Sequence, residues 1–156
     1  MMGNKGVANM IGAMIARRKI QSAFDSLSLK DLDTFIAKWA EDAIFIFPSP
    51  AGPGFPKSNY TIEGREAIKE WYKRFLAEWE ITTFFIKNIC VERLCPIAIY
   101  SNFVTVEWDL KLIAKGKKDG DDTSGVITIT IEKGKASEVR VYECQDDPIW
   151  RVLGPR

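Results

Sequence analysis

Residues 32–48 read LDTFIAKWAEDAIFIFP, and this stretch contains the change of hydrophobic period that decides the fold. Its first half carries apolar residues at positions i, i+3, i+4 and i+7, namely Leu32, Phe35, Ile36 and Trp39. That spacing is one face of a helix, which we expect to end near Glu41. Residues 43–47 are rich in β-forming types and are followed by Pro48, so they predict a short strand.

Outside this stretch the chain predicts two more helices and four longer strands. The helices cover about residues 5–27 and 64–78, and a loop rich in proline and glycine covers residues 48–60. From Glu80 onward the period becomes two, and the candidate strands are residues 82–94, 97–114, 125–133 and 137–144, with Gly134 as a hairpin turn. The order α-α-β-α-β-β-β-β predicts an α+β fold, with three helices packed on one face of a curved antiparallel sheet.

Composition indicates one globular domain spanning residues 1–156. The chain has 22 basic and 21 acidic side chains, so its formal net charge is 22 − 21 = +1 and it lacks the basic excess of nucleic-acid-binding proteins. It has no histidine, which excludes Ser-His-Asp and Cys-His nucleophiles and histidine-ligated zinc. Any acid–base chemistry must therefore use carboxylates, Tyr, Lys or Cys, and we expect neither a metal nor an organic cofactor.

The cysteines and the N-terminal segment favour a cytoplasmic protein. Cys90, Cys95 and Cys144 are odd in number and lack metal-ligand spacing, so they predict free thiols in a reducing compartment. The apolar run at residues 7–16 is too short to cross a bilayer, and its basic residues follow it rather than precede it. We therefore expect no membrane partner.

Alternation along the strands predicts which side chains face inward. In residues 104–112 the even positions are all apolar and the odd ones all polar, which places Val106 and Trp108 on the inner face. Ile129 faces inward by the same rule, and Glu143 shares a face with Val139 and Val141. A carboxylate on an apolar row would have a raised pKa and could act as a general acid or base. The alternative is that Glu143, at a strand end, lies in water.

The acidic pair Glu107 and Asp109 allows two interpretations. Paired carboxylates on one strand face could act in catalysis or hold a divalent cation. The favoured interpretation is an outer face that is solvated or contacts another subunit, with Lys111 balancing the charge. A bulge in this strand would exchange the faces and turn both carboxylates into the pocket.

Aromatic residues at helical and strand spacing predict a cup-shaped apolar pocket lining, called the aromatic cup below, with one polar group at its tip. Its members are Trp39, Phe45, Phe47, Trp71, Phe75 and Trp108, with the hydroxyl of Tyr72 as the tip. Such a lining suits a flat hydrophobic ligand, although aromatic stripes are more often plain core. Asn102 lies in the same register as Trp108 and could offer that ligand a donor and an acceptor, or else lie at a strand edge in solvent.

Two motifs carry a family resemblance. WAEDA leading into a strand that ends at Pro48, and IEGREAIKEWY at residues 62–72, resemble the cone-shaped α+β barrel superfamily of nuclear transport factor two, ketosteroid isomerase and the SnoaL-like polyketide cyclases. The resemblance extends from about Ile20 to Asp147. It implies a cystatin-like topology with a pocket inside a cone, and it turns Ala43, Phe45 and Phe47 inward.

The resemblance also implies that the isomerase mechanism is absent. Phe47 stands where ketosteroid isomerase has its catalytic aspartate, Ala23 matches its oxyanion tyrosine, and Ile127 matches its protonated aspartate. Tyr72 matches the tyrosine that supports this network. Steroid-type proton transfer is therefore not expected.

Two functions remain open. One is binding of a small hydrophobic molecule, cyclic or aromatic, with cofactor-free isomerisation, cyclisation or dehydration in which Glu143 is the acid–base group and Tyr72 and Asn102 are its hydrogen-bonding partners. The other is a non-catalytic carrier or dimeric interaction scaffold. Family members commonly pair through the outer sheet face, so we expect a homodimer; the residues concerned are Phe103, Thr105, Glu107 and Asp109.

Overall fold

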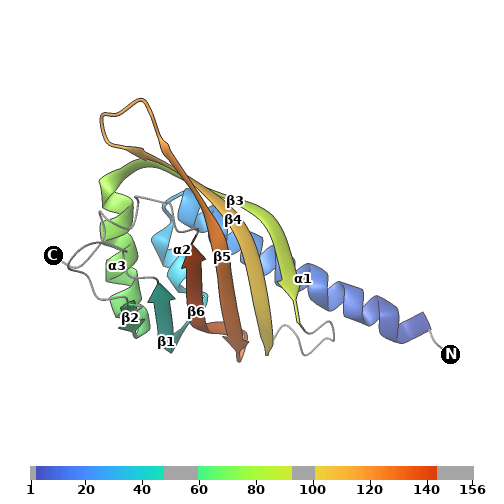
Figure 1. Cartoon of the computed structure of the whole chain (residues 1–156). Helices are drawn as coiled ribbons and strands as arrows, with labels where there is room; N and C mark the ends of the chain where they lie inside the picture. The colour runs from blue at the N-terminus through green and yellow to red at the C-terminus, as the bar shows by residue number, and fades with distance from the viewer. Residues whose placement is uncertain (1–2, 48–59, 93–100, 144–156) are drawn as a thin grey trace.

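Three helices lie on one side of a curved sheet of six strands (Figure 1). The computed structural model describes residues 3–47, 60–92 and 101–143. The elements are α1 (Gly3–Ser28), α2 (Leu32–Ile36), β1 (Trp39–Phe47), β2 (Tyr60–Glu63), α3 (Arg65–Glu78), β3 (Trp79–Val91), β4 (Asn102–Ala114), β5 (Asp121–Glu132) and β6 (Lys135–Glu143). The α+β class and the curved sheet are confirmed. No helix in the described ranges is long and apolar enough to cross a membrane.

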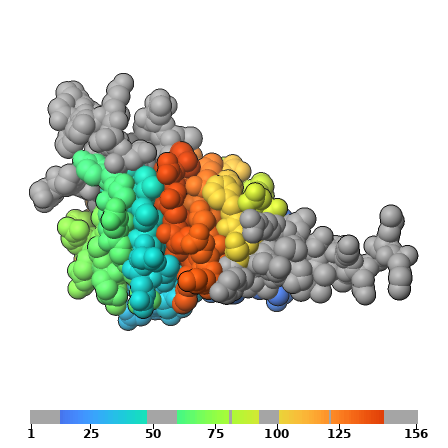
Figure 2. Space-filling model, turned by 90° about the horizontal axis from the view of Figure 1, so that it is seen from below, coloured from blue at the N-terminus to red at the C-terminus, as the bar shows by residue number. Residues whose placement is uncertain are grey.

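The sheet is mixed, which corrects the expectation of a purely antiparallel one. Its strand order is β2-β1-β6-β5-β4-β3, and Figure 2 shows the last five of these strands side by side in that order. Strands β3 to β6 form an antiparallel meander, and β2 pairs antiparallel with β1. Strand β1 runs parallel to β6. Parallel neighbours need a long crossover between them, and here the connection includes α3 and other strands of the sheet.

The second helix is shorter than its apolar spacing predicts. It ends at Ile36, and Trp39 begins β1 instead of closing the helical stripe. The N–H of Ala136 donates a 2.9 Å hydrogen bond to the carbonyl of Lys38, and Trp39 is aligned with Ala136 in β6. Pairing with a distant strand thus replaces the last helical turn, while Trp39 is buried as either element would require.

Strand β2 begins at the last residue of the predicted loop, and its other three residues lie between that loop and the third helix, where the sequence predicts no element. Its four residues pair with the end of β1, with Ile62 opposite Phe45 and Tyr60 opposite Phe47. Only half of its positions are exposed, and the Tyr60 and Phe47 rings stack at 5.4 Å. The remainder of the predicted loop, residues 48–59, lies outside the described residues.

The predicted inner and outer faces of β1 and β4 are confirmed. Ala43, Phe45 and Phe47 are buried, and the alternation in β4 runs unbroken from Asn102 to Leu112. The irregularities of the β3–β4 pair lie in the neighbouring strand β3, one at Glu80 and one at Lys87, the latter between the pairs Ile86–Trp108 and Asn88–Glu107. The inner and outer faces of β4 are not exchanged, because β4 itself has no inserted residue.

The acidic pair of β4 lies on the outer, solvated face. The bulged residue Lys87 places its Nζ 3.5 Å from an Oδ of Asp109 and 3.9 Å from an Oε of Glu107. The cation within ion-pair distance of both carboxylates is thus Lys87, which the sequence pattern does not single out, and the predicted outer face is right. The extra residue of a bulge re-aims its side chain, which is why Lys87 reaches two carboxylates on the adjacent strand.

Candidate functional site

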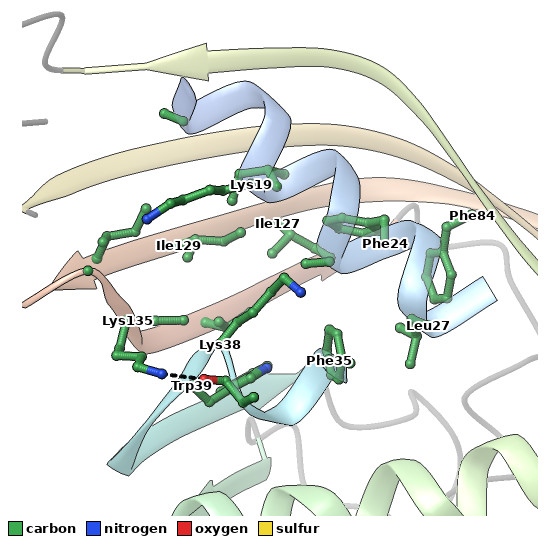
Figure 3. Close-up of a pocket in the computed structure, with 18 of the residues that line it drawn as sticks. Lys19, Phe24, Leu27, Phe35, Lys38, Trp39, Phe84, Ile127, Ile129 and Lys135 are labelled. Atoms are coloured by element: carbon green, nitrogen blue, oxygen red, sulfur yellow. Dashed lines mark hydrogen bonds between the residues drawn. The ribbon is translucent and has the colours of Figure 1, made fainter. Parts of the chain in front are cut away.

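A cavity with a volume of about 380 Å³ lies between α1, the α2–β1 junction and the β5–β6 hairpin (Figure 3). Its lining is mostly aliphatic and aromatic. The residues are Ala16, Lys19, Ile20, Ala23, Phe24, Leu27, Phe35, Ala37, Lys38, Trp39, Tyr72, Phe84, Ile127, Ile129, Ile131, Gly134, Lys135, Ala136 and Val139. A concave, mainly apolar site of this size suits a small organic molecule.

Helix α1 forms one wall. Ile20, Phe24 and Leu27 are buried at helical spacing, and Ala16 and Ala23 lie on the same face. The two alanines lack the bulk that would fill the space against the sheet. The sequence shows the apolar stripe of α1 at Ile20, Phe24 and Leu27, and the small side chains on the same face were the available signal for a cavity.

The sheet forms the opposite wall. Ile127, Ile129 and Ile131 project from β5 at alternate positions, and Val139 projects from β6 beside Ile129. The predicted ligand residue Ile129 therefore lies in the lining. A turn with positive φ at Lys133 and Gly134 closes the hairpin, and this tight connection places Lys135 directly at the edge of the cavity.

Most of the predicted aromatic cup surrounds a second, much smaller cavity. It has a volume of about 30 Å³, which is enough for one or two waters, and its lining includes Phe45, Trp71, Tyr72, Phe75 and Trp108. Trp71 stacks on Phe75 at 5.5 Å and meets Phe45 at 5.2 Å. The structure brings these rings together as an interlocked cluster, whose members largely fill the space between them.

Tyr72 connects the two cavities. Together with Phe84 and Ile127 it lines both of them. Its ring packs against Phe35 at 4.8 Å and Phe45 at 5.5 Å. Burial raises the pKa of the Tyr72 hydroxyl well above its ordinary value, so the group is neutral at physiological pH and can donate a hydrogen bond.

Three other predicted ligand residues lie outside the described linings. Phe47 is buried between Tyr60 and Trp71, with ring centres 5.4 and 5.2 Å away. Val106 is fully buried in the core. Asn102 is 3% exposed, and its Oδ1 accepts a 2.9 Å hydrogen bond from the N–H of Phe103, so the alternative of a solvent-facing strand edge is wrong.

Glu143, the predicted acid–base group, is the last residue of β6. Its backbone pairs with Gly125, and it follows Val139 and Val141, both buried, at alternate positions of the strand. Its side chain lies outside the described residues. Within those residues, no acidic side chain lines either cavity, and no group of three His, Cys, Asp or Glu residues gathers as metal ligands would.

Two of the three positions that match isomerase catalytic residues line the large cavity. Ala23 is on the α1 wall and Ile127 is on the sheet wall, whereas Phe47 is at the far end of the aromatic cluster. All three residues are apolar.

Comparisons with known proteins agree with this geometry. The model of the SnoaL-like domain matches residues 20–139. The chain superposes on "Putative Scytalone Dehydratase" from Novosphingobium aromaticivorans with a TM-score of 0.70 and 15% identity, covering 89% of this chain and 88% of that one. No curated protein matches the chain in sequence.

Two further solved structures share the fold. One is a protein with a ketosteroid isomerase-like fold from Catenulispora acidiphila, solved in complex with trimethylamine, with a TM-score of 0.61, 15% identity and coverage of 79% of this chain and 82% of that one. The other is an uncharacterized cystatin-fold protein from Novosphingobium aromaticivorans, with a TM-score of 0.60, 16% identity and coverage of 87% and 98%. At these identities the likeness shows the fold.

Proposed function

Because the chain belongs to the SnoaL-like domain family, we propose that it binds a small apolar molecule in the cavity between α1 and the β5–β6 hairpin. The observation that carries this proposal is the cavity itself, with a volume of about 380 Å³ and a mostly apolar lining. Ligand sites are typically concave, mainly apolar and of this size, so the cavity suits a small ligand that enters from its open side. Phe35 and Trp39 form an aromatic side of the lining, which supports a cyclic or aromatic ligand.

A cofactor-free isomerisation, cyclisation or dehydration is the second candidate function. Tyr72 favours it, since this residue lines the cavity and its neutral hydroxyl is a donor that can polarise a carbonyl of a ligand. The acid–base role of Glu143 stays a prediction. Binding is the first candidate because the volume and the apolar lining of the cavity support it without any role for Glu143.

A pocket-filling substitution tests the binding proposal. N-phenyl-1-naphthylamine, a neutral aromatic probe, is expected to bind the wild-type chain with a rise in fluorescence. Ala23→Phe places a ring in the cavity and should weaken this binding at least about tenfold, which corresponds to ~1.4 kcal/mol. Fluorescence titration gives the dissociation constants.

The matched control adds the same ring outside the cavity. Ala77 is exposed on α3, so Ala77→Phe should leave probe binding unchanged. Circular dichroism verifies that both variants remain folded. Equal binding by the wild type and by a folded Ala23→Phe variant would contradict the proposal.

We also propose that the outer face of the sheet pairs two copies of the chain. The described helices lie on the other face, and Phe85, Phe103 and Tyr142 are exposed here. Light scattering should give twice the mass of one chain, and Phe103→Glu should shift it toward the monomer by placing a charge in the interface. Leu29→Glu, which alters an exposed residue in the α1–α2 turn, should leave the mass unchanged. A monomeric wild type would refute the pairing.

A further inference from the structure

Three lysines surround the large cavity, each on a different element. Lys19 belongs to α1, Lys38 to the segment between α2 and β1, and Lys135 to the start of β6. Figure 3 shows all three beside the apolar side chains of the lining. They supply every charged group in the described lining, which contains no Asp or Glu.

This accumulation of charge is local. The whole chain carries a net charge of only +1, whereas the described lining of this one cavity carries three positive charges and no negative one. A generally basic surface therefore does not explain it. Like charges gathered at the edge of one cavity repel one another, and a bound anion would relieve that repulsion.

No described carboxylate neutralises these ammonium groups directly. The ion pairs among the described residues use five other cations, namely Arg65, Lys69, Lys73, Lys87 and Arg140. Lys38 donates a 3.2 Å hydrogen bond to the carbonyl of Thr34, and Lys135 donates to that of Ala37. Lys38 does lower the pKa of Asp31, but the hydrogen bonds from Thr34 are the larger cause of that shift.

We propose that the ligand is an amphipathic anion: an apolar body enters the cavity, and a carboxylate or sulfonate group stays at its edge among Lys19, Lys38 and Lys135. This inference rests on the proposed function, since it needs the apolar body to occupy the same cavity. Lysine is a flexible point charge with three donors, so the three lysines select the sign of the charge on the head group. The apolar lining of the cavity selects the shape of the body.

Two dyes that differ by one charged group test the proposal. N-phenyl-1-naphthylamine is neutral, and 8-anilinonaphthalene-1-sulfonate carries a sulfonate on the same framework. The wild-type chain should bind the sulfonate more tightly than the neutral dye. The double variant K19Q/K38Q should weaken sulfonate binding about fivefold or more and leave the neutral dye within about twofold of the wild type.

A second double variant removes the same net charge elsewhere. Lys117 and Lys118 are exposed in the β4–β5 turn and line neither cavity, so K117Q/K118Q should bind both dyes as the wild type does. Raising the salt concentration should weaken sulfonate binding to the wild type and to K117Q/K118Q, and affect K19Q/K38Q less. Ala23→Phe should weaken both dyes, which assigns them to this cavity.

The outcomes separate the two proposals. Sulfonate binding that depends on Lys19 and Lys38 but not on the control lysines supports the inference. A second outcome refutes only the anionic ligand. In it, Ala23→Phe weakens binding of the neutral dye, but the sulfonate binds the wild type no more tightly than the neutral dye does, or binds K19Q/K38Q as tightly as the wild type. The proposal that the cavity binds an apolar ligand then stands. If neither dye responds to Ala23→Phe in a folded protein, the proposed function itself fails and the inference falls with it.

Discussion

Phe45→Ala is expected to lower the free energy of unfolding by about 3–5 kcal/mol, the range for removing a buried aromatic ring from a core. Phe45 is 1% exposed, and its ring lies 5.2–5.9 Å from those of Trp39, Phe47, Trp71 and Tyr72. Removing it leaves these rings without their common neighbour, and the cavity would exceed what small shifts can close. Urea denaturation followed by circular dichroism measures the change.

The control lies next to it on the other face of the strand. Ile46 is only half-buried, so Ile46→Ala should cost about 1 kcal/mol. The comparison tests the register of β1 directly, because a shift of one residue would exchange the two positions. Equal losses of stability for the two variants would contradict the inward orientation of Phe45.

Gly125→Ala should destabilise the protein by about 2–3 kcal/mol because there is no room for a methyl group. Gly125 lies opposite Trp108 across the β4–β5 pair. A Cβ at this position would lie 2.5 Å from the carbonyl oxygen of Tyr142 and 2.8 Å from Cζ2 of Trp108. The backbone oxygen belongs to the sheet and Trp108 is 1% exposed, so neither group can move away easily. Thermal and urea unfolding measure the loss, and near-ultraviolet circular dichroism should report the displaced Trp108.

Gly116→Ala separates crowding from backbone strain. Gly116 has a φ of +75°, and a Cβ added to it would meet no atom within 4 Å, so its substitution carries only the conformational cost, about 1 kcal/mol. At Gly125, in contrast, the loss comes from contact with the neighbouring atoms. If Gly125→Ala lowered the free energy of unfolding no more than Gly116→Ala does, the atoms of Tyr142 and Trp108 around Gly125 would have to move aside easily, which would contradict the packing described.

The candidate site was only partly predictable from sequence. The strand period places Ile129 on the inner face, and the aromatic residues of β1 and α3 do gather, but around a cavity too small for more than about two waters. The larger cavity depends on two alanines of α1, which in sequence are ordinary members of an apolar stripe. Lys19 is exposed on its helix, so its position alone indicates only a solvated face.

The lysine group depends on a contact between distant parts of the chain. The carbonyls of Ala37 and Lys38 accept hydrogen bonds from Lys135 and Ala136, where the parallel β1–β6 pair begins. This contact brings Lys38 beside Lys135, and α1 adds Lys19 from the opposite wall. A sequence pattern reports only neighbours along the chain, so it could not indicate that these three charges face one cavity.

What the sequence by itself determined was the kind of each long element and the direction of its side chains. Periods of 3.6 and 2 express burial on one face of a helix or strand, so α1, α3 and the inner face of β4 follow from local order. The inner face of β1, whose residues 43–47 are all apolar, followed from the family resemblance instead. Only the tertiary structure decided that Trp39 starts a strand, that β2 forms, and that β1 runs parallel to β6. These outcomes depend on hydrogen bonds and packing between segments far apart in the chain, which override the weak local preference of short segments. The cavity, and the charges around it, exist only once those segments meet.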